Sequence, residues 1–187
     1  MHRHGLSALV FALSLNGAAL AGGMGGPAAW LGNRVDVAQT AFCRANGCKL
    51  VEVRQNTEAH EGWHDGTHRT YRLRGGERLE VAVRPGGWIS NAFLFFPNQP
   101  ALNGPAAITP NGHRLAAGFL SAVTGRRFSA GAVAACDRAG QEALAHDPDV
   151  YGPPDALSRW TTPVGVPYKA RCGVTWQLGV WAGWMQA

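Results

Sequence analysis

The sequence predicts an α+β fold in which an antiparallel β-meander of about four to five strands packs against helices on one face. Two observations predict it. Apolar and polar residues alternate in short runs between residues 50 and 96, and glycine-rich turns separate these runs. Apolar residues recur at helical spacing before this region and again after it. Because short turns join antiparallel neighbours, we expect an antiparallel sheet with one solvated face.

The first twenty-one residues have the pattern of an export signal. Residues 1–4 form a basic head, residues 5–15 an apolar run and residues 19–21 a small-x-small cleavage site. An uncleaved anchor would need about 20 apolar residues, and this run is shorter. We therefore expect a cleaved signal peptide over 1–21, a flexible leader over 22–27 and a single α+β domain over 28–187. No later run is apolar enough to span a bilayer, so the predicted location is secreted or periplasmic.

The first predicted helix starts near Ala28. Its evidence is the helical spacing of Leu31, Val35, Ala38 and Phe42. We expect it to end at Asn46-Gly47, because glycine readily adopts the left-handed conformation that caps a helix.

Four strands of the meander follow. Their apolar runs are residues 50–53, 70–73, 79–83 and 89–96, and turns are expected at Asp65-Gly66, Gly75-Gly76 and residues 85–87. A two-residue turn at Gly75-Gly76 would set Leu73 opposite Arg78, whereas a three-residue loop ending at Glu77 sets Leu73 opposite Leu79. Because residues on one face pair only with the same face of the neighbouring strand, we expect the three-residue loop.

Two further helices and one long strand complete the predicted order. Prolines exclude regular structure from residues 98–111, and a second helix then runs from Leu115 to Gly125. Ser129 is the expected cap of a third helix. After a second proline-rich loop over 146–167, residues 168–180 alternate strictly, which predicts one long C-terminal strand that returns to the sheet.

The four cysteines are Cys43, Cys48, Cys136 and Cys172. An even count in an exported chain predicts two disulfides in any of three pairings. We favour Cys43 with Cys48, which would join the end of the first helix to the chain leaving it. We pair Cys136 with Cys172, which would tie the third helix to the last strand. No C-x2-C spacing supports zinc binding or a thioredoxin-like redox role.

The segment His60-Glu61-Gly62-Trp63-His64 matches the H-E-x-x-H motif of zinc hydrolases. On a helix, His60 and His64 would hold the metal and Glu61 would activate the bound water. Gly62 and the neighbouring polar residues disfavour a helix here, so we expect a hairpin. In an extended strand His60 and His64 lie about 13 Å apart, which is too far for one metal ion. His64 and His68 would face each other across the hairpin as a weak metal pair.

Basic and aromatic residues supply the candidate binding groups. Cleavage would remove Arg3 and lower the formal charge from +5 to +4, a mild excess that favours anionic surfaces. The arginines interleave with apolar strand residues and are expected on the solvated sheet face. Two tryptophans near the C-terminus could be exposed. The candidate binding residues are Arg69, Arg72, Arg74, Arg78, Trp181 and Trp184.

The sequence contains no G-x-S-x-G nucleophile motif and no RNA-binding or helix-turn-helix signature. Together these features predict an exported, non-catalytic binding or structural module of unknown ligand, with no cofactor and no specific nucleic-acid partner. An envelope component or an anionic polymer is the expected class of partner. The alternative is a small zinc-dependent hydrolase that uses His60, His64 and Glu61.

Overall fold

The computed structural model describes residues 29–56, 66–97, 108–146, 158–161, 167–174 and 178–184. The surroundings of residues 56, 143 and 144 lie outside the description, as do those of every residue after His146 except Ala170, Val180 and Gly183. The predicted signal peptide and leader also lie outside it. Among the described residues, none of the helices has the length and apolar character needed to cross a membrane.

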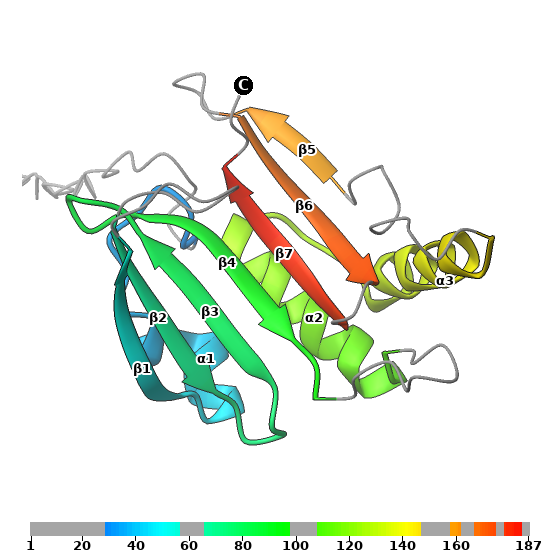
Figure 1. The fold of residues 1–187 in the computed structure, drawn as a ribbon, viewed down its shortest axis with the longest axis horizontal. Helices are drawn as coiled ribbons and strands as arrows, with labels where there is room; N and C mark the ends of the chain where they lie inside the picture. Colours follow the sequence, from blue (N-terminus) through cyan, green and yellow to red (C-terminus); the bar gives the residue numbers. More distant parts are fainter. Residues whose placement is uncertain are drawn as a thin grey trace, which may run out of the picture.

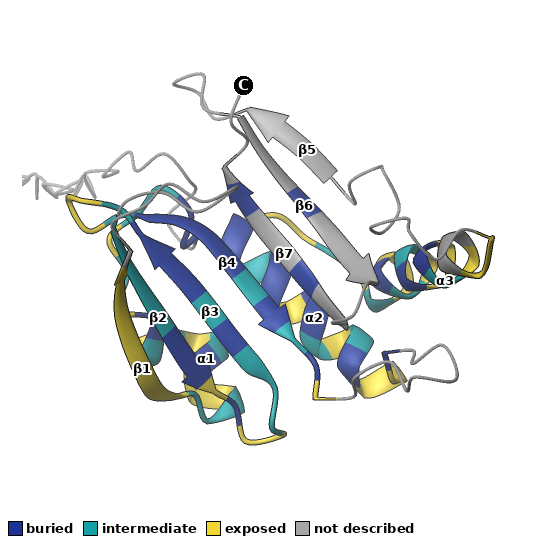
Figure 2. Ribbon diagram, in the orientation of Figure 1, coloured by how far each residue is buried: buried dark blue, intermediate teal, exposed yellow. Residues whose placement is uncertain are grey.

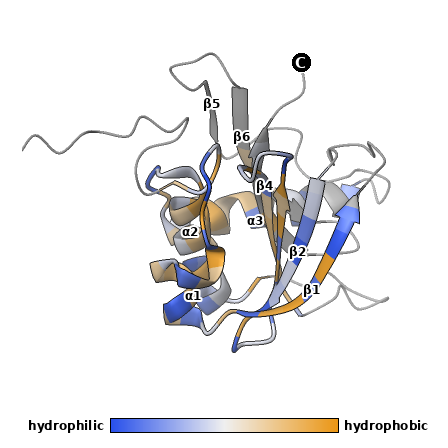
Figure 3. Ribbon diagram, turned by 90° about the vertical axis from the view of Figure 1, so that its left-hand side faces the viewer, coloured by the Kyte–Doolittle hydropathy of each residue, from blue (hydrophilic) through white to orange (hydrophobic). Residues whose placement is uncertain are grey.

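Within the described residues, seven strands form one antiparallel sheet in the order β1-β2-β3-β4-β7-β6-β5 (Figure 1). The strands are Lys49–Asn56 (β1), Gly66–Arg72 (β2), Arg78–Val83 (β3), Ile89–Phe95 (β4), Ser158–Thr161 (β5), Pro167–Val174 (β6) and Leu178–Trp184 (β7). The helices are the 3₁₀ turn η1 (Val37–Gln39), α1 (Ala41–Asn46), α2 (Pro110–Thr124) and α3 (Ala130–His146). Figure 3 shows the three α-helices on one side of the sheet. The predicted α+β class, the four-stranded meander β1 to β4 and the two later helices are therefore confirmed.

The first helix is much shorter than predicted. Residues 29–36 are not helical, and α1 begins only at Ala41. The chain turns at Gly32, whose φ is +77°, and Leu31 forms a parallel bridge with Ile89 of β4. Thr40 caps α1 by accepting a hydrogen bond from the Cys43 amide, which sets where the helix begins. The helical spacing of the apolar residues therefore reflects their burial in an irregular segment and not one continuous helix.

The turn between β2 and β3 keeps the predicted length but not the predicted register. The Leu73 amide donates to the Glu77 carbonyl over 2.9 Å, so the three-residue loop is residues 74–76. Tyr71 consequently pairs with Leu79, and Leu73 does not. The shift is two residues, which leaves the same side chains on each face. The alternation of side chains therefore predicted the buried face correctly, but the predicted cross-strand partners are wrong.

The C-terminal region forms a hairpin in place of one long strand. β6 and β7 pair antiparallel, with Gly173 opposite Gly179 and Val174 opposite Leu178, so the chain reverses between them. β5 was also not predicted; it lies within the stretch expected to be loop and pairs with β6. A hairpin whose two strands continue the same alternation has the sequence pattern of one strand, because the short connection preserves the period of two.

The hydrophobic core lies between the sheet and α2. Figure 2 shows the buried positions concentrated on the central strands and on α2. Trp30, Phe42 and Phe119 form an aromatic cluster with ring centroids 5.9 to 6.1 Å apart. The amides of Trp30 and Leu31 both donate to the Val123 carbonyl over 3.0 Å, so the first described segment is held against the end of α2.

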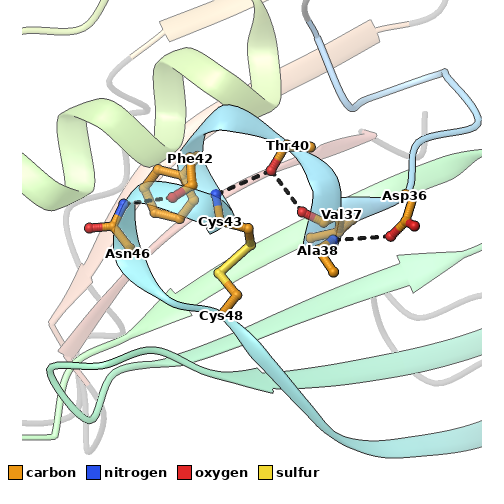
Figure 4. Close-up of a disulfide and its surroundings, with 8 residues drawn as sticks. All are labelled: Asp36, Val37, Ala38, Thr40, Phe42, Cys43, Asn46 and Cys48. Carbon is orange, nitrogen blue, oxygen red and sulfur yellow. Dashed lines mark hydrogen bonds between the residues drawn. A yellow bond between two sulfur atoms is a disulfide. The ribbon is translucent and has the colours of Figure 1, made fainter.

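The disulfide Cys43–Cys48 forms as predicted, with the two Cα atoms 4.9 Å apart (Figure 4). It joins α1 to the chain entering β1, where Gly47 adopts the left-handed cap conformation with φ +66°. Cys136 is also disulfide-bonded. Because the side chain of Cys172 lies outside the described residues, the pairing Cys136–Cys172 stays a prediction.

Candidate functional site

The H-E-x-x-H residues His60, Glu61 and His64 lie outside the described residues, so the zinc hypothesis is not tested. The predicted turn at Asp65-Gly66 is wrong, because Gly66 already pairs with Asn56 of β1. His68 pairs with Arg54 rather than facing His64. Among the described residues, no group of three or more histidine, cysteine, aspartate or glutamate side chains is placed to hold a metal ion.

His68 lies in an environment that disfavours its charged form. Its pKa is lowered from the ordinary value, first by burial of the imidazole and second by the charge of Arg54. The neutral imidazole is therefore favoured in the folded protein.

The strand register places the arginines of the predicted basic face on two different faces of the sheet. Arg72 and Arg78 pair across β2 and β3 and share the face away from the helices, whereas Arg69 pairs with Val81 on the opposite face. Arg74 follows β2 in the turn. The expectation that these arginines share one solvated face is therefore wrong, because a strand sends successive side chains to opposite sides.

On the face away from the helices, Arg78 is engaged by neighbouring side chains. Arg78 forms an ion pair with Glu80 over 2.8 Å, and its guanidinium lies 4.6 Å from the ring centroid of Phe95. Phe95 stacks on Phe93 with an interplanar angle of 2°. Burial raises the pKa of Glu80, and the charge of Arg78 opposes that shift. These contacts occupy the cation with intramolecular partners and do not favour a polyanion site here.

Trp181 and Trp184 lie on β7. Trp181 pairs with Phe93 of β4 and Trp184 with Tyr168 of β6. Their side chains lie outside the described residues, so their exposure stays a prediction.

A cavity of about 410 Å³ opens where α1 ends, the β2–β3 turn begins and α2 starts. Its volume falls in the range of small-molecule sites. The apolar lining comes from Phe96, Pro97, Ile108 and Leu115, and Gly112 and Ala45 add further wall. The polar lining comes from Asn46, Arg74, Glu77, Thr109 and Asn111. This combination of an apolar wall and a few convergent polar groups is typical of a binding site.

Local sequence signals bring these elements together. Thr109 accepts a hydrogen bond from the Gly112 amide over 3.1 Å and caps α2, and Pro110 occupies the first helical turn. The predicted loop therefore ends earlier than expected, because α2 begins at Pro110 rather than beyond Asn111. The Arg74 amide donates to the Asn46 carbonyl over 3.0 Å, which ties the β2–β3 turn to the end of α1.

Two opposite charges line the cavity. A Cβ atom added at Gly47 would lie 3.4 Å from the Arg74 guanidinium nitrogens, so that side chain crosses the glycine. A Cβ atom at Gly75 would lie 2.5 Å from the Glu77 carboxylate oxygens, so the carboxylate folds back over the turn. Within the described part of the chain, no ion pair or side-chain hydrogen bond links Arg74 or Glu77 to another residue. Both charges are therefore available to a ligand.

Arg74 is the one predicted binding residue that the structure places in the cavity. The sequence reasoning missed Asn46, Glu77, Thr109 and Asn111, because their neighbours in the sequence predict only turns and loops. The signal that could have indicated Thr109 is its position before Pro110 at the start of an apolar helical pattern. Nothing in the sequence indicates that the ends of three separate elements meet.

The chain matches no protein-family model, no curated protein and no solved structure.

Proposed function

We propose that the protein is an exported, non-catalytic binding module and that the cavity beside α2 is its ligand site. The observation that carries the proposal is the pair of opposite charges, Arg74 and Glu77, which have no ion-pair or side-chain hydrogen-bond partner among the described residues and lie beside an apolar wall in a cavity of about 410 Å³. A guanidinium selects a carboxylate with two parallel hydrogen bonds, and a carboxylate selects an ammonium group.

The ligand class that fits is a small zwitterion with an apolar body, such as an amino acid or a short peptide. Its carboxylate would bind Arg74, its ammonium group Glu77 and its apolar part the wall formed by Phe96, Ile108 and Leu115. The predicted pairing of Cys136 with Cys172 belongs to this proposal as well, since an oxidising compartment permits both disulfides.

Calorimetric titration with leucyl-leucine tests the site. We expect Arg74→Ala to weaken binding at least tenfold, because the carboxylate loses its cation, and Glu77→Gln to weaken it severalfold. The matched controls are Arg127→Ala and Glu142→Gln, which alter exposed charges elsewhere and should bind like the parent. N-acetylation of the dipeptide should weaken binding to the parent but not to Glu77→Gln.

The proposal fails if leucyl-leucine and free leucine give no heat of binding with the parent protein. It also fails if Arg74→Ala binds them unchanged, because the cavity would then not be the site.

A further inference from the structure

Among the described residues, nothing pairs with the outer edge of β1, and this edge carries apolar side chains. β1 is the first strand in the sheet order and, among the described strands, pairs only with β2. Leu50, Val51 and Val53 on this strand are 52%, 57% and 54% exposed. Figure 2 shows β1 as an exposed strand at the end of the sheet. An edge with unpaired backbone groups and apolar side chains is a template for pairing with another strand.

The charges on β1 are arranged so that one copy of the strand can complement a second copy. Glu52 and Arg54 flank Val53 and form an ion pair over 3.1 Å. Their cross-strand partners Thr70 and His68 place both on the face away from the helices. If two copies of β1 pair antiparallel about Val53, Glu52 of each copy lies opposite Arg54 of the other. Opposite charges in that position stabilise a strand pair.

Neighbouring registers lack this complementarity. Centring the pair on Glu52 sets the two Glu52 side chains opposite each other, and centring it on Arg54 does the same for the two arginines. Like charges directly opposite destabilise a strand pair. A register shifted by one residue would place side chains of opposite faces against each other. Charge and parity together therefore select the register centred on Val53.

We propose that the protein forms a two-fold symmetric homodimer in which β1 pairs antiparallel with β1 of a second copy about Val53. The two sheets then join into one continuous sheet, and the two Val53 side chains meet at the axis. The interface gives each copy backbone partners along the β1 edge that no described strand covers. None of its residues lines the cavity, so this inference is independent of the ligand proposal.

Charge reversal tests the register. Glu52→Lys and Arg54→Glu each place two like-charge pairs in the interface and should give monomers. An equimolar mixture of the two variants should recover a dimer of the parent's mass, because each like-charge pair becomes an opposite-charge pair in the mixed dimer. Sedimentation velocity and light scattering report the mass, and a fluorescent label on one variant shows that the dimer is mixed.

Matched controls separate this effect from net charge. Glu142→Lys and Arg127→Glu make the same charge changes at exposed positions outside β1 and should remain dimeric. The side chains of Glu52 and Arg54 are 49% and 63% exposed, so the reversals leave the core unaltered. Val53→Arg is a second route to a monomer, because it sets two cations at the axis.

Three results would each overturn the proposal. They are a monomeric parent throughout the micromolar range, single reversals that remain dimeric, and a mixture in which no mixed dimer forms.

Discussion

At the scale of single residues, Glu80 shows how burial and charge compete. Its side chain is 16% exposed, and burial raises its pKa. The charges of Arg78 and Arg54 lower the pKa, while the nearby Glu52 raises it further. Burial is the largest of these causes, so the protonated carboxyl is favoured more in the folded protein than in the unfolded chain.

This shift predicts a pH dependence of stability. A carboxyl whose folded-state pKa lies above its unfolded value contributes fully below the unfolded pKa, and that contribution is lost as pH rises through the folded pKa. The stability of the parent relative to Glu80→Gln should therefore decrease as pH rises from about 4, near the unfolded pKa of glutamate. Urea unfolding at a series of pH values measures the decrease.

Arg78→Gln provides the check on the cause, because removing the nearest cation should make the decrease larger. Parallel stability curves for the parent and Glu80→Gln would contradict the assignment.

At the scale of elements, α2 contains two glycines in different surroundings. A Cβ atom added at Gly118 would have no neighbour within 4 Å. A Cβ atom added at Gly112 would lie 2.6 Å from Ile108 Cγ2 and 3.2 Å from Phe96 Cε1. The first turn of α2 therefore packs closely against the end of β4, and only a glycine at position 112 permits that approach.

We expect Gly118→Ala to stabilise the protein by about 1 kcal/mol, because alanine is the better helix former. Gly112→Ala gains the same preference but overpacks the contact with Ile108, so it should be less stable than Gly118→Ala by about 1–3 kcal/mol. Thermal unfolding of both variants beside the parent measures the difference. Equal stability of the two variants would contradict close packing of the first turn of α2 against Ile108 and Phe96.

At the scale of the whole molecule, Asp137 joins segments that are distant in sequence. It lies on α3 and is 2% exposed. Its Oδ2 atom accepts a hydrogen bond from the Ile108 amide over 3.1 Å and lies 2.9 Å from His113 Nε2 on α2. One carboxylate therefore positions α3, α2 and the residue that leads into the cavity.

Asp137→Ala should cost about 1–3 kcal/mol of unfolding free energy, because the buried Ile108 amide loses its acceptor. Asp137→Asn keeps an acceptor oxygen and should cost less. Arg138→Ala, an exposed change on the same helix, should stay within about 0.5 kcal/mol of the parent in chemical denaturation. An Asp137→Ala variant as stable as the parent would mean that the hydrogen bond to Ile108 does not hold the segment.

The sequence by itself determined the elements whose evidence is local. Alternation predicted the meander, Gly125 and Ser129 marked the helix boundaries between α2 and α3, and the five-residue separation of Cys43 and Cys48 predicted their disulfide. In each case neighbouring residues carry the whole signal, because period, caps and short loops depend on the adjacent chain.

Tertiary structure decided what depends on distant contacts. Burial against Val123 and Ile89 keeps residues 29–36 out of a helix despite their helical spacing. A period-two pattern does not indicate the chain reversal between β6 and β7, because both strands continue the same alternation. The cavity exists only because the ends of α1, β2 and β4 meet the start of α2. Arg74 and Glu77 face one space for that reason, and no spacing along the chain encodes it.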